Sequence, residues 1–163
     1  TDFSAAPTDA QGVPVANRVE AGKRPRSTMA PTLVFKGTDA SNFLMATGSP
    51  GGGTIIQYVL KTVVGALDWG LDAQQATAMV DFGAANSPTT NVGGEHPNVA
   101  ADNGGQNDAL VQGLKNLGHT VNVGAQSSGT STIVRSRQGG AHSWTGGADP
   151  RREGLALGDT FLP

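Results

Sequence analysis

The segment that most constrains the fold runs from an apolar strand, through a glycine-rich turn, into a long apolar helical pattern. Residues 43–47 have the pattern of a strand, residues 49–53 read Ser-Pro-Gly-Gly-Gly, and the helical pattern begins at Ile55. The first amides of a helix have no partner within the helix, and the helix dipole adds positive potential there. Such a turn favours a negative group: a phosphate, a carboxylate or the oxyanion of an acyl-transfer intermediate.

Hydrophobic periodicity on both sides of this turn predicts a hairpin and two helices. Residues 32–35 form a short β-type run, and a polar turn joins them to the strand at 43–47, which predicts a hairpin. Apolar residues then recur at helical spacing over 55–69. Asp72 is placed to cap a second helix over 73–80.

The second half of the chain also mixes helix and strand patterns. Residues 82–106 are rich in Gly, Asn, Pro and Thr, which predicts irregular loop with a short strand near 95–99. A helix is predicted over 108–117. Three further strands are predicted at residues 119–123, 130–136 and 142–147. We expect one layered domain over residues 1–163, of the α/β or α+β class, with helices packed on a mainly antiparallel sheet.

Composition excludes several classes of function. The net charge is −2 and charged residues make up 15% of the chain, so there is no electrostatic case for binding nucleic acid or a membrane surface. The absence of cysteine excludes disulfides and thiolate metal sites. No apolar run has the length of a membrane span. His96, His119 and His142 lack the spacing of paired ligands, so no metal site is expected.

The turn resembles two known motifs but lacks residues that each of them needs. Gly48 and Gly53 have the spacing of a phosphate-binding P-loop. However, Thr54 stands where that motif needs its lysine, and Ile55 stands where it needs the Ser or Thr after the lysine. Ser49 is not a nucleophile elbow, because Thr47 stands where the leading glycine belongs. Nucleotide binding and an elbow serine are therefore both disfavoured.

A basic segment precedes the hairpin and has two interpretations. Residues 17–29 carry four cations followed by the hydroxyls of Ser27 and Thr28. The segment is either a solvated basic loop or a place where cations and hydroxyls converge on an anion. The four cations are Arg18, Lys23, Arg24 and Arg26.

Three motifs in this order resemble the small subunit of γ-glutamyltranspeptidases. They are Lys-Arg-Pro-Arg-Ser-Thr-Met-Ala-Pro-Thr at 23–32, Gly-Ser-Pro-Gly-Gly at 48–52 and Ala-Asp-Pro-Arg-Arg-Glu-Gly at 148–154. The opening Thr-Asp-Phe-Ser of residues 1–4 is similar to the Met-Asp-Asp-Phe-Ser segment of that family. The resemblance spans essentially the whole chain.

The resemblance implies an incomplete N-terminal nucleophile hydrolase, a four-layer αββα sandwich of the α+β class. In this family a precursor cleaves itself into a large and a small subunit, and the new N-terminal Thr attacks a γ-glutamyl amide. The chain would be the C-terminal part of the small subunit, with the large subunit as its partner and a γ-glutamyl small molecule as its substrate. The resemblance also implies that no cofactor is needed and that the protein is periplasmic or extracellular.

The same resemblance assigns roles to five residues. Asp2 would hold the α-amino group of the substrate, because a carboxylate pairs with an ammonium. Ser27 and Thr28 would bind the α-carboxylate, with Thr28 in place of the usual second Ser. Gly51 and Gly52 would supply the oxyanion-hole amides, the role that the strand–glycine–helix pattern indicates independently.

Aligned by its motifs, Thr1 lies a few tens of residues after the family's nucleophile, beside Asp2, so we do not expect it to be the nucleophile. We expect this chain alone to be inactive, since the nucleophile and the large subunit lie outside it. Two alternatives stay open: a non-catalytic remnant or interaction module with the same fold, and a related glutaryl acylase. The leaving group and the balance of transfer and hydrolysis also stay open.

Overall fold

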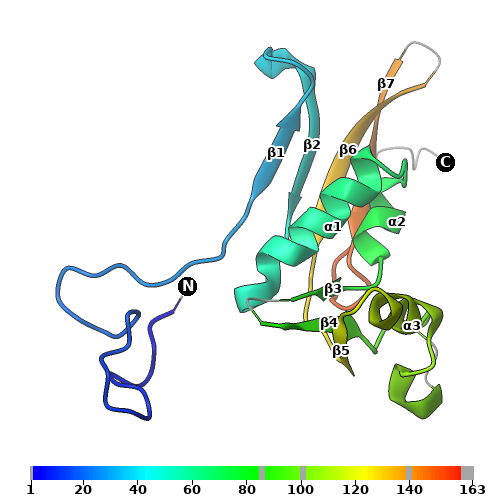
Figure 1. Ribbon diagram of the computed structural model, residues 1–163. Helices are drawn as coiled ribbons and strands as arrows, with labels where there is room; N and C mark the ends of the chain where they lie inside the picture. Colours follow the sequence, from blue (N-terminus) through cyan, green and yellow to red (C-terminus); the bar gives the residue numbers. More distant parts are fainter. Residues whose placement is uncertain (1, 85–86, 100–101, 139–140, 159–163) are drawn as a thin grey trace.

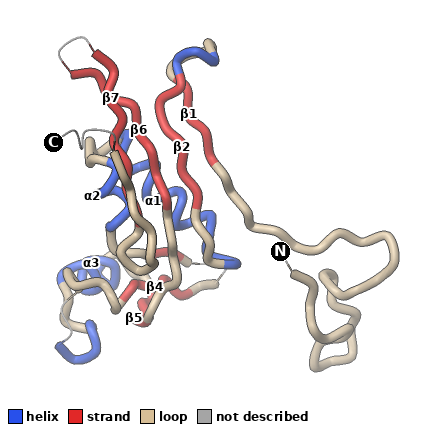
Figure 2. Tube along the Cα trace, turned by 180° about the vertical axis from the view of Figure 1, so that it is seen from behind, coloured by secondary structure: helices blue, strands red, loops and turns tan. Residues whose placement is uncertain are grey.

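Two sheets with packed helices form the body of the molecule, and residues 2–31 extend from it as an arm (Figures 1 and 2). The computed structural model describes residues 2–84, 87–99, 102–138 and 141–158. The first sheet has the order β1-β2-β6-β7 and is antiparallel throughout. Its strands are β1 (Thr32–Phe35), β2 (Phe43–Gly48), β6 (Ser131–Gln138) and β7 (Ala141–Ala148).

The second sheet is smaller and mixed. It has the order β3-β4-β5, in which β4 is antiparallel to β3 and parallel to β5. Its strands are β3 (Phe82–Gly83), β4 (Thr89–Gly93) and β5 (Thr120–Gly124). Val92, Val99 and Val111 form its buried cluster.

In the described part of the chain, three α-helices pack on these sheets. Helices α1 (Ile55–Leu67) and α2 (Ala73–Ala78) lie on one face of the first sheet, and α3 (Ala109–Asn116) lies beside the second (Figure 1). Three short 3-10 turns complete the element order: η1 (Ala40–Asn42), η2 (Gly52–Thr54) and η3 (Asp102–Gly105). Within the described residues, no helix is long and apolar enough to cross a membrane.

The predicted hairpin and both predicted helices of the first half are confirmed. Thr32 pairs with Thr47 across β1 and β2. The Asp72 carboxylate accepts from the Gln75 amide at 2.7 Å, and the Gln75 side chain accepts from the Asp72 amide at 3.1 Å, a complete capping box. Helix α1 ends at Leu67, two residues earlier than predicted, and α2 ends at Ala78 because Met79 is already extended.

The prediction for residues 82–106 is wrong. This stretch contains β3, β4 and η3, whereas residues 95–99, predicted as a strand, form turns and bends. The side chain of His96 holds this turn, because its Nε2 lies 2.7 Å from the Ala78 carbonyl oxygen and its Nδ1 accepts from the Asn98 amide at 3.1 Å. Strands β5, β6 and β7 and helix α3 match their predicted positions to within two residues.

The face of the first sheet opposite α1 and α2 carries exposed apolar side chains. Leu33 is 65% exposed, Ile133 50% and Trp144 55%. A hollow of about 610 Å³ lies over part of this face, between the sheet and residues 154–157. The first sheet is therefore covered by helices on one side only within the described residues, in keeping with an α+β sandwich that lacks a layer.

Candidate active site

The glycine turn between β2 and α1 adopts a backbone that only glycine accepts readily. Gly51 has φ +136° and Gly52 has φ +57°, both in the region that disfavours residues with a Cβ. A Cβ on Gly51 would also lie 2.4 Å from Cε2 of the buried Tyr58 ring. The Gly51 carbonyl accepts from the amide of Thr54 at 3.2 Å and from its hydroxyl at 2.7 Å, which closes the turn into η2.

The amides of this turn are available to a ligand. No described residue accepts a hydrogen bond from the backbone N–H of Gly51 or Gly52. Both amides stand at the start of the η2–α1 helical run, where donors lack intrahelical partners and the dipole favours negative charge. The structure therefore offers two neighbouring N–H donors suited to an oxyanion.

The arm contacts this turn through Thr28. Its Oγ1 donates a hydrogen bond to the Gly52 carbonyl oxygen. The neighbouring Ser27 Oγ accepts from the Met29 amide at 3.4 Å. Two of the three sequence motifs, 24 residues apart, thus meet at Thr28 and Gly52.

Asp2 joins the same region through an ion pair with Arg26. The Arg26 Nε and Nη2 atoms donate to the two Asp2 carboxylate oxygens at 3.2 and 3.0 Å. The two residues also exchange backbone hydrogen bonds, each of 2.9 Å. Asp2 is therefore paired with the residue that directly precedes Ser27 and Thr28, and its carboxylate is bound by the guanidinium of that residue. Thr1 lies outside the described residues.

The other cations of the basic segment do not gather at an anion site. Arg18 and Lys23 each lie 2.9 Å from the Glu20 carboxylate, and the Lys23 ammonium lowers the pKa of Glu20. Arg24 makes no ion pair with any described residue. The interpretation that all four cations converge on one anion is wrong, because three of them form ion pairs with two separate carboxylates: Arg18 and Lys23 with Glu20, and Arg26 with Asp2.

A loop at residues 126–130 packs against the glycine turn and binds it through hydrogen bonds. The Gly129 amide donates to Ser49 Oγ at 3.1 Å, and that hydroxyl donates to the Pro50 carbonyl at 2.7 Å. A Cβ on Gly129 would lie 2.7 Å from Pro50 Cγ, so the two segments are in close contact. The Tyr58 hydroxyl also binds this loop, since it accepts from the Ser127 amide at 3.3 Å.

The third motif holds that loop. The Asp149 carboxylate accepts from Ser128 Oγ at 2.5 Å and from the Thr130 amide at 3.1 Å. The Arg152 guanidinium donates to the carbonyls of Ser127 and Ser128 at 2.9 and 3.1 Å. Burial raises the pKa of Asp149, but the hydrogen bonds from Ser128, the backbone and Arg151 outweigh it, so the pKa lies below its ordinary value.

A buried charge cluster ties the same motif to both sheets. Arg151 lies 3.0 Å from Asp149, 2.7 Å from Glu95 and 3.3 Å from Asp81. Asp81, fully buried, also lies 2.6 Å from the Lys61 ammonium on α1. Burial lowers the pKa of Lys61, opposed by the Asp81 carboxylate. A buried cluster of this kind is weak evidence for stability, because the cost of desolvating the charges can exceed their attraction.

Sequence reasoning did not identify Asp149, Arg151, Arg152 or Ser49 as parts of the site. The motif at 148–154 carried the family resemblance but no role. Its only local signal was a run of charged residues directly after an apolar strand pattern, which is equally typical of a solvated turn.

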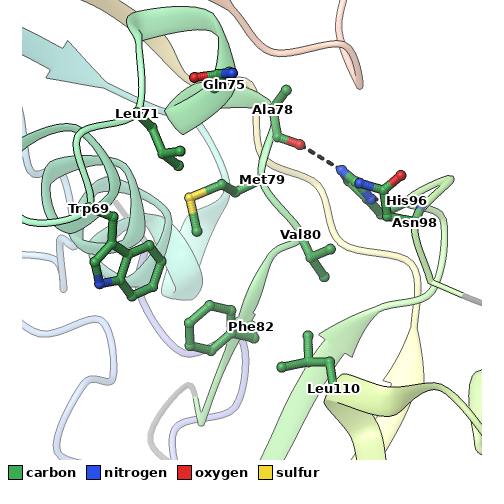
Figure 3. Close-up of a pocket in the computed structure, with 10 residues that line it drawn as sticks. All are labelled: Trp69, Leu71, Gln75, Ala78, Met79, Val80, Phe82, His96, Asn98 and Leu110. Carbon is green, nitrogen blue, oxygen red and sulfur yellow. Dashed lines mark hydrogen bonds between the residues drawn. The ribbon is translucent and has the colours of Figure 1, made fainter.

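An apolar hollow of about 570 Å³ lies elsewhere, between α2, β3 and α3 (Figure 3). Trp69, Met79 and Phe82 form its walls. Two of its polar lining side chains already have partners, since His96 binds the Ala78 carbonyl and Gln75 caps α2. It shares no residue with the three motifs. Among the described residues, no group of three or more His, Asp or Glu side chains could hold a metal ion.

The fold is of the N-terminal nucleophile hydrolase type, and the solved structures similar to it include γ-glutamyltranspeptidases. An acivicin-inhibited γ-glutamyltranspeptidase superposes with a TM-score of 0.70 at 25% identity, over 93% of this chain and 77% of that one. The Pseudomonas nitroreducens γ-glutamyltranspeptidase gives 0.69 at 23% identity, over 96% and 77%. A cephalosporin acylase from Bacillus halodurans gives 0.55 at 21% identity, over 72% of this chain and 20% of that one.

The chain belongs to the γ-glutamyltranspeptidase family, whose model matches residues 1–159. The glutathione hydrolase proenzyme of Pseudomonas sp. (strain A14) is 34% identical over 155 residues, 88% of this chain. That of Escherichia coli (strain K12) is 46% identical over 84 residues, 47% of this chain. The matches span 24% and 13% of these two relatives, so the chain corresponds to a minor part of their length.

Proposed function

We propose that this chain is the C-terminal part of the small subunit of a γ-glutamyl transferase or hydrolase. In the complete protein it supplies the oxyanion hole and the sites for the α-amino and α-carboxylate groups of the substrate. The observation that carries the proposal is the hydrogen bond from Thr28 to Gly52, which joins the predicted carboxylate site to the predicted oxyanion hole.

The chemistry assigned to Gly51 and Gly52 follows from their amides. A threonine of the complete protein, which is not part of this chain and is not Thr1, attacks the γ-carbonyl carbon of the substrate, and the carbonyl oxygen becomes an oxyanion. The two N–H groups donate to that oxyanion and lower the barrier. Expulsion of the amine leaves the acyl group as an ester on the threonine. Water then hydrolyses this ester, or the amino group of an amino acid accepts the acyl group.

The roles assigned to Ser27 and Thr28 require a proton to turn. A hydroxyl has one proton, and Thr28 gives its proton to the Gly52 carbonyl in the unliganded chain. On substrate binding, the same proton turns to the α-carboxylate. The carboxylate of Asp2, which is paired with the residue before Ser27, accepts hydrogen bonds from the α-ammonium group.

The remainder of the complete protein is assigned to the exposed apolar face of the first sheet. Leu33, Ile133 and Trp144 are each at least half exposed there, which is unusual for a face that stays in water. We assign this face to a further sheet of the αββα sandwich, formed with the large subunit. By the same family relation, we assign the complete enzyme to the periplasm or the cell exterior.

The test is release of p-nitroaniline by the full-length protein that contains this chain. We expect release from γ-glutamyl-p-nitroanilide or from glutaryl-p-nitroanilide, faster with an amino-acid acceptor if transfer dominates. A folded and processed full-length protein that releases neither would instead be a binding module with the same fold.

A further inference from the structure

The carboxylate assigned to the substrate's α-amino group is already bound. Both Asp2 oxygens accept from the Arg26 guanidinium, at 3.2 and 3.0 Å, in the two-pronged geometry typical of arginine and carboxylate. Because the guanidinium contacts the carboxylate that is proposed to bind the substrate ammonium, the cation lies within the proposed binding site.

The backbone builds this ion pair, so it does not depend on two long side chains meeting by chance. Asp2 and Arg26 face each other in an antiparallel bridge and exchange two backbone hydrogen bonds. Asn17 holds both partners, because its side-chain oxygen accepts from the Arg26 amide and its side-chain nitrogen donates to the Asp2 carbonyl, each at 3.2 Å.

The ion pair changes the charge that a substrate meets. A free Asp2 would present one negative charge to an ammonium group, whereas the Asp2–Arg26 pair presents none. An incoming ammonium must share the carboxylate with Arg26 and is repelled by the guanidinium. An acyl group that carries only a carboxylate incurs neither cost. Arg18 and Lys23 have no such effect, because Glu20 binds both.

We propose that Arg26 is a specificity-determining residue that competes with the substrate ammonium for Asp2. Through this competition, Arg26 shifts the enzyme from γ-glutamyl amides toward amides of dicarboxylic acids without an α-amino group, of which glutaryl is the simplest. The inference rests on the proposed function and names the substrate class of that same site.

The test compares kcat/KM for γ-glutamyl- and glutaryl-p-nitroanilide in the full-length protein. Arg26→Met removes the charge but keeps an unbranched side chain. We expect it to raise the ratio of γ-glutamyl to glutaryl kcat/KM by about 1.4- to fivefold, the range of an exposed ion pair, mainly through a lower γ-glutamyl KM.

Two controls separate this role from a structural one. Arg24→Met removes a cation from the same segment that has no ion-pair partner among the described residues, and we expect it to leave the ratio unchanged. In an Asp2→Asn background, Arg26→Met should no longer alter the ratio, because the competition is for the Asp2 charge.

The outcomes are distinct. A protein that releases either anilide, but whose ratio is unaltered by Arg26→Met, overturns the inference and leaves the proposed function standing. An equal change in Arg24→Met, or a persistent change in the Asp2→Asn background, also overturns it. A protein that releases neither anilide contradicts the proposed function and this inference together.

Discussion

Replacing Gly51 by alanine should impair catalysis far more than binding. The added Cβ would lie 2.4 Å from Tyr58 Cε2 and 2.9 Å from Cδ2, whereas ordinary carbon contacts begin near 3.4 Å. Tyr58 cannot yield, because it is 2% exposed and its hydroxyl binds Gln126 and Ser127. The turn must therefore move by about 1 Å, and Gly51 must also leave its φ of +136°.

The size of the effect follows from the role of the amide. Moving one oxyanion-hole donor out of place costs about 3 kcal/mol of transition-state stabilisation, which is about a hundredfold in kcat. The substrate carboxylate and ammonium bind to other groups, so KM should change by less than about threefold. We expect this pattern in steady-state assays of p-nitroaniline release by the full-length Gly51→Ala variant.

Gly52→Ala is the matched control. A Cβ on Gly52 meets nothing within 4 Å, and its φ of +57° costs alanine only about 1 kcal/mol. Its amide stays in place, so kcat should fall by less than about tenfold. If the two variants lost kcat equally, or if Gly51→Ala raised only KM, the assignment of the oxyanion hole would be refuted.

Two further predictions concern the groups around the turn. Thr28→Val should raise KM about tenfold for both anilides, because a hydroxyl that donates to the substrate carboxylate is lost, while Thr28→Ser should keep the wild-type KM. Equal KM values for the Val and Ser variants would exclude this role of the hydroxyl. Asp149→Asn should destabilise the full-length protein by about 3 kcal/mol at pH 7, since a buried ion pair with Arg151 is broken. Because the pKa of Asp149 is lower in the folded protein than its ordinary value of 3.8, the stabilisation by this carboxylate is complete above about pH 3.8 and is lost as pH falls through the folded-state pKa. The unfolding temperatures of wild type and variant should therefore differ at pH 7 and converge in acid.

Much of the fold near the glycine turn was predictable because its determinants are local. The hairpin follows from two short apolar β-type runs joined by a polar turn, and α1 follows from apolar residues at helical spacing. Asp72 and Gln75 form the capping box from residues three apart. These signals act within one element and do not depend on the rest of the chain.

Strands β3 and β4 were not predictable from the same signals. Residues 89–93 are Thr-Thr-Asn-Val-Gly, a weak strand former by composition. They are held as a strand by parallel pairing with β5, about 30 residues later, and by burial of Val92. Strand propensity depends on neighbouring residues in the sequence and does not reveal pairing with a distant strand. Residues 82–106 were therefore predicted to be mostly loop.

The candidate site divides in the same way. The donors at Gly51 and Gly52 follow from a strand, a glycine turn and a helix in sequence, which can be read directly. The support from Ser128, Gly129 and Asp149 depends on contacts between segments 80–100 residues from the turn. The ion pair of Asp2 was also missed, because its partner lies 24 residues away and belongs to a segment that resembles a solvated loop.

The central claim is that the glycine turn and the Ser27–Thr28 pair bind one acyl group, with the third motif supporting the turn through the loop at residues 126–130. The most direct measurement is a crystal structure of the full-length protein with a γ-glutamyl or glutaryl phosphonate, whose tetrahedral phosphorus mimics the acyl-transfer intermediate. We predict one phosphonyl oxygen at about 2.7–3.1 Å from both the Gly51 and Gly52 amides, and the ligand carboxylate on the hydroxyls of Ser27 and Thr28. A phosphonate bound elsewhere, with both glycine amides facing solvent, would contradict the account.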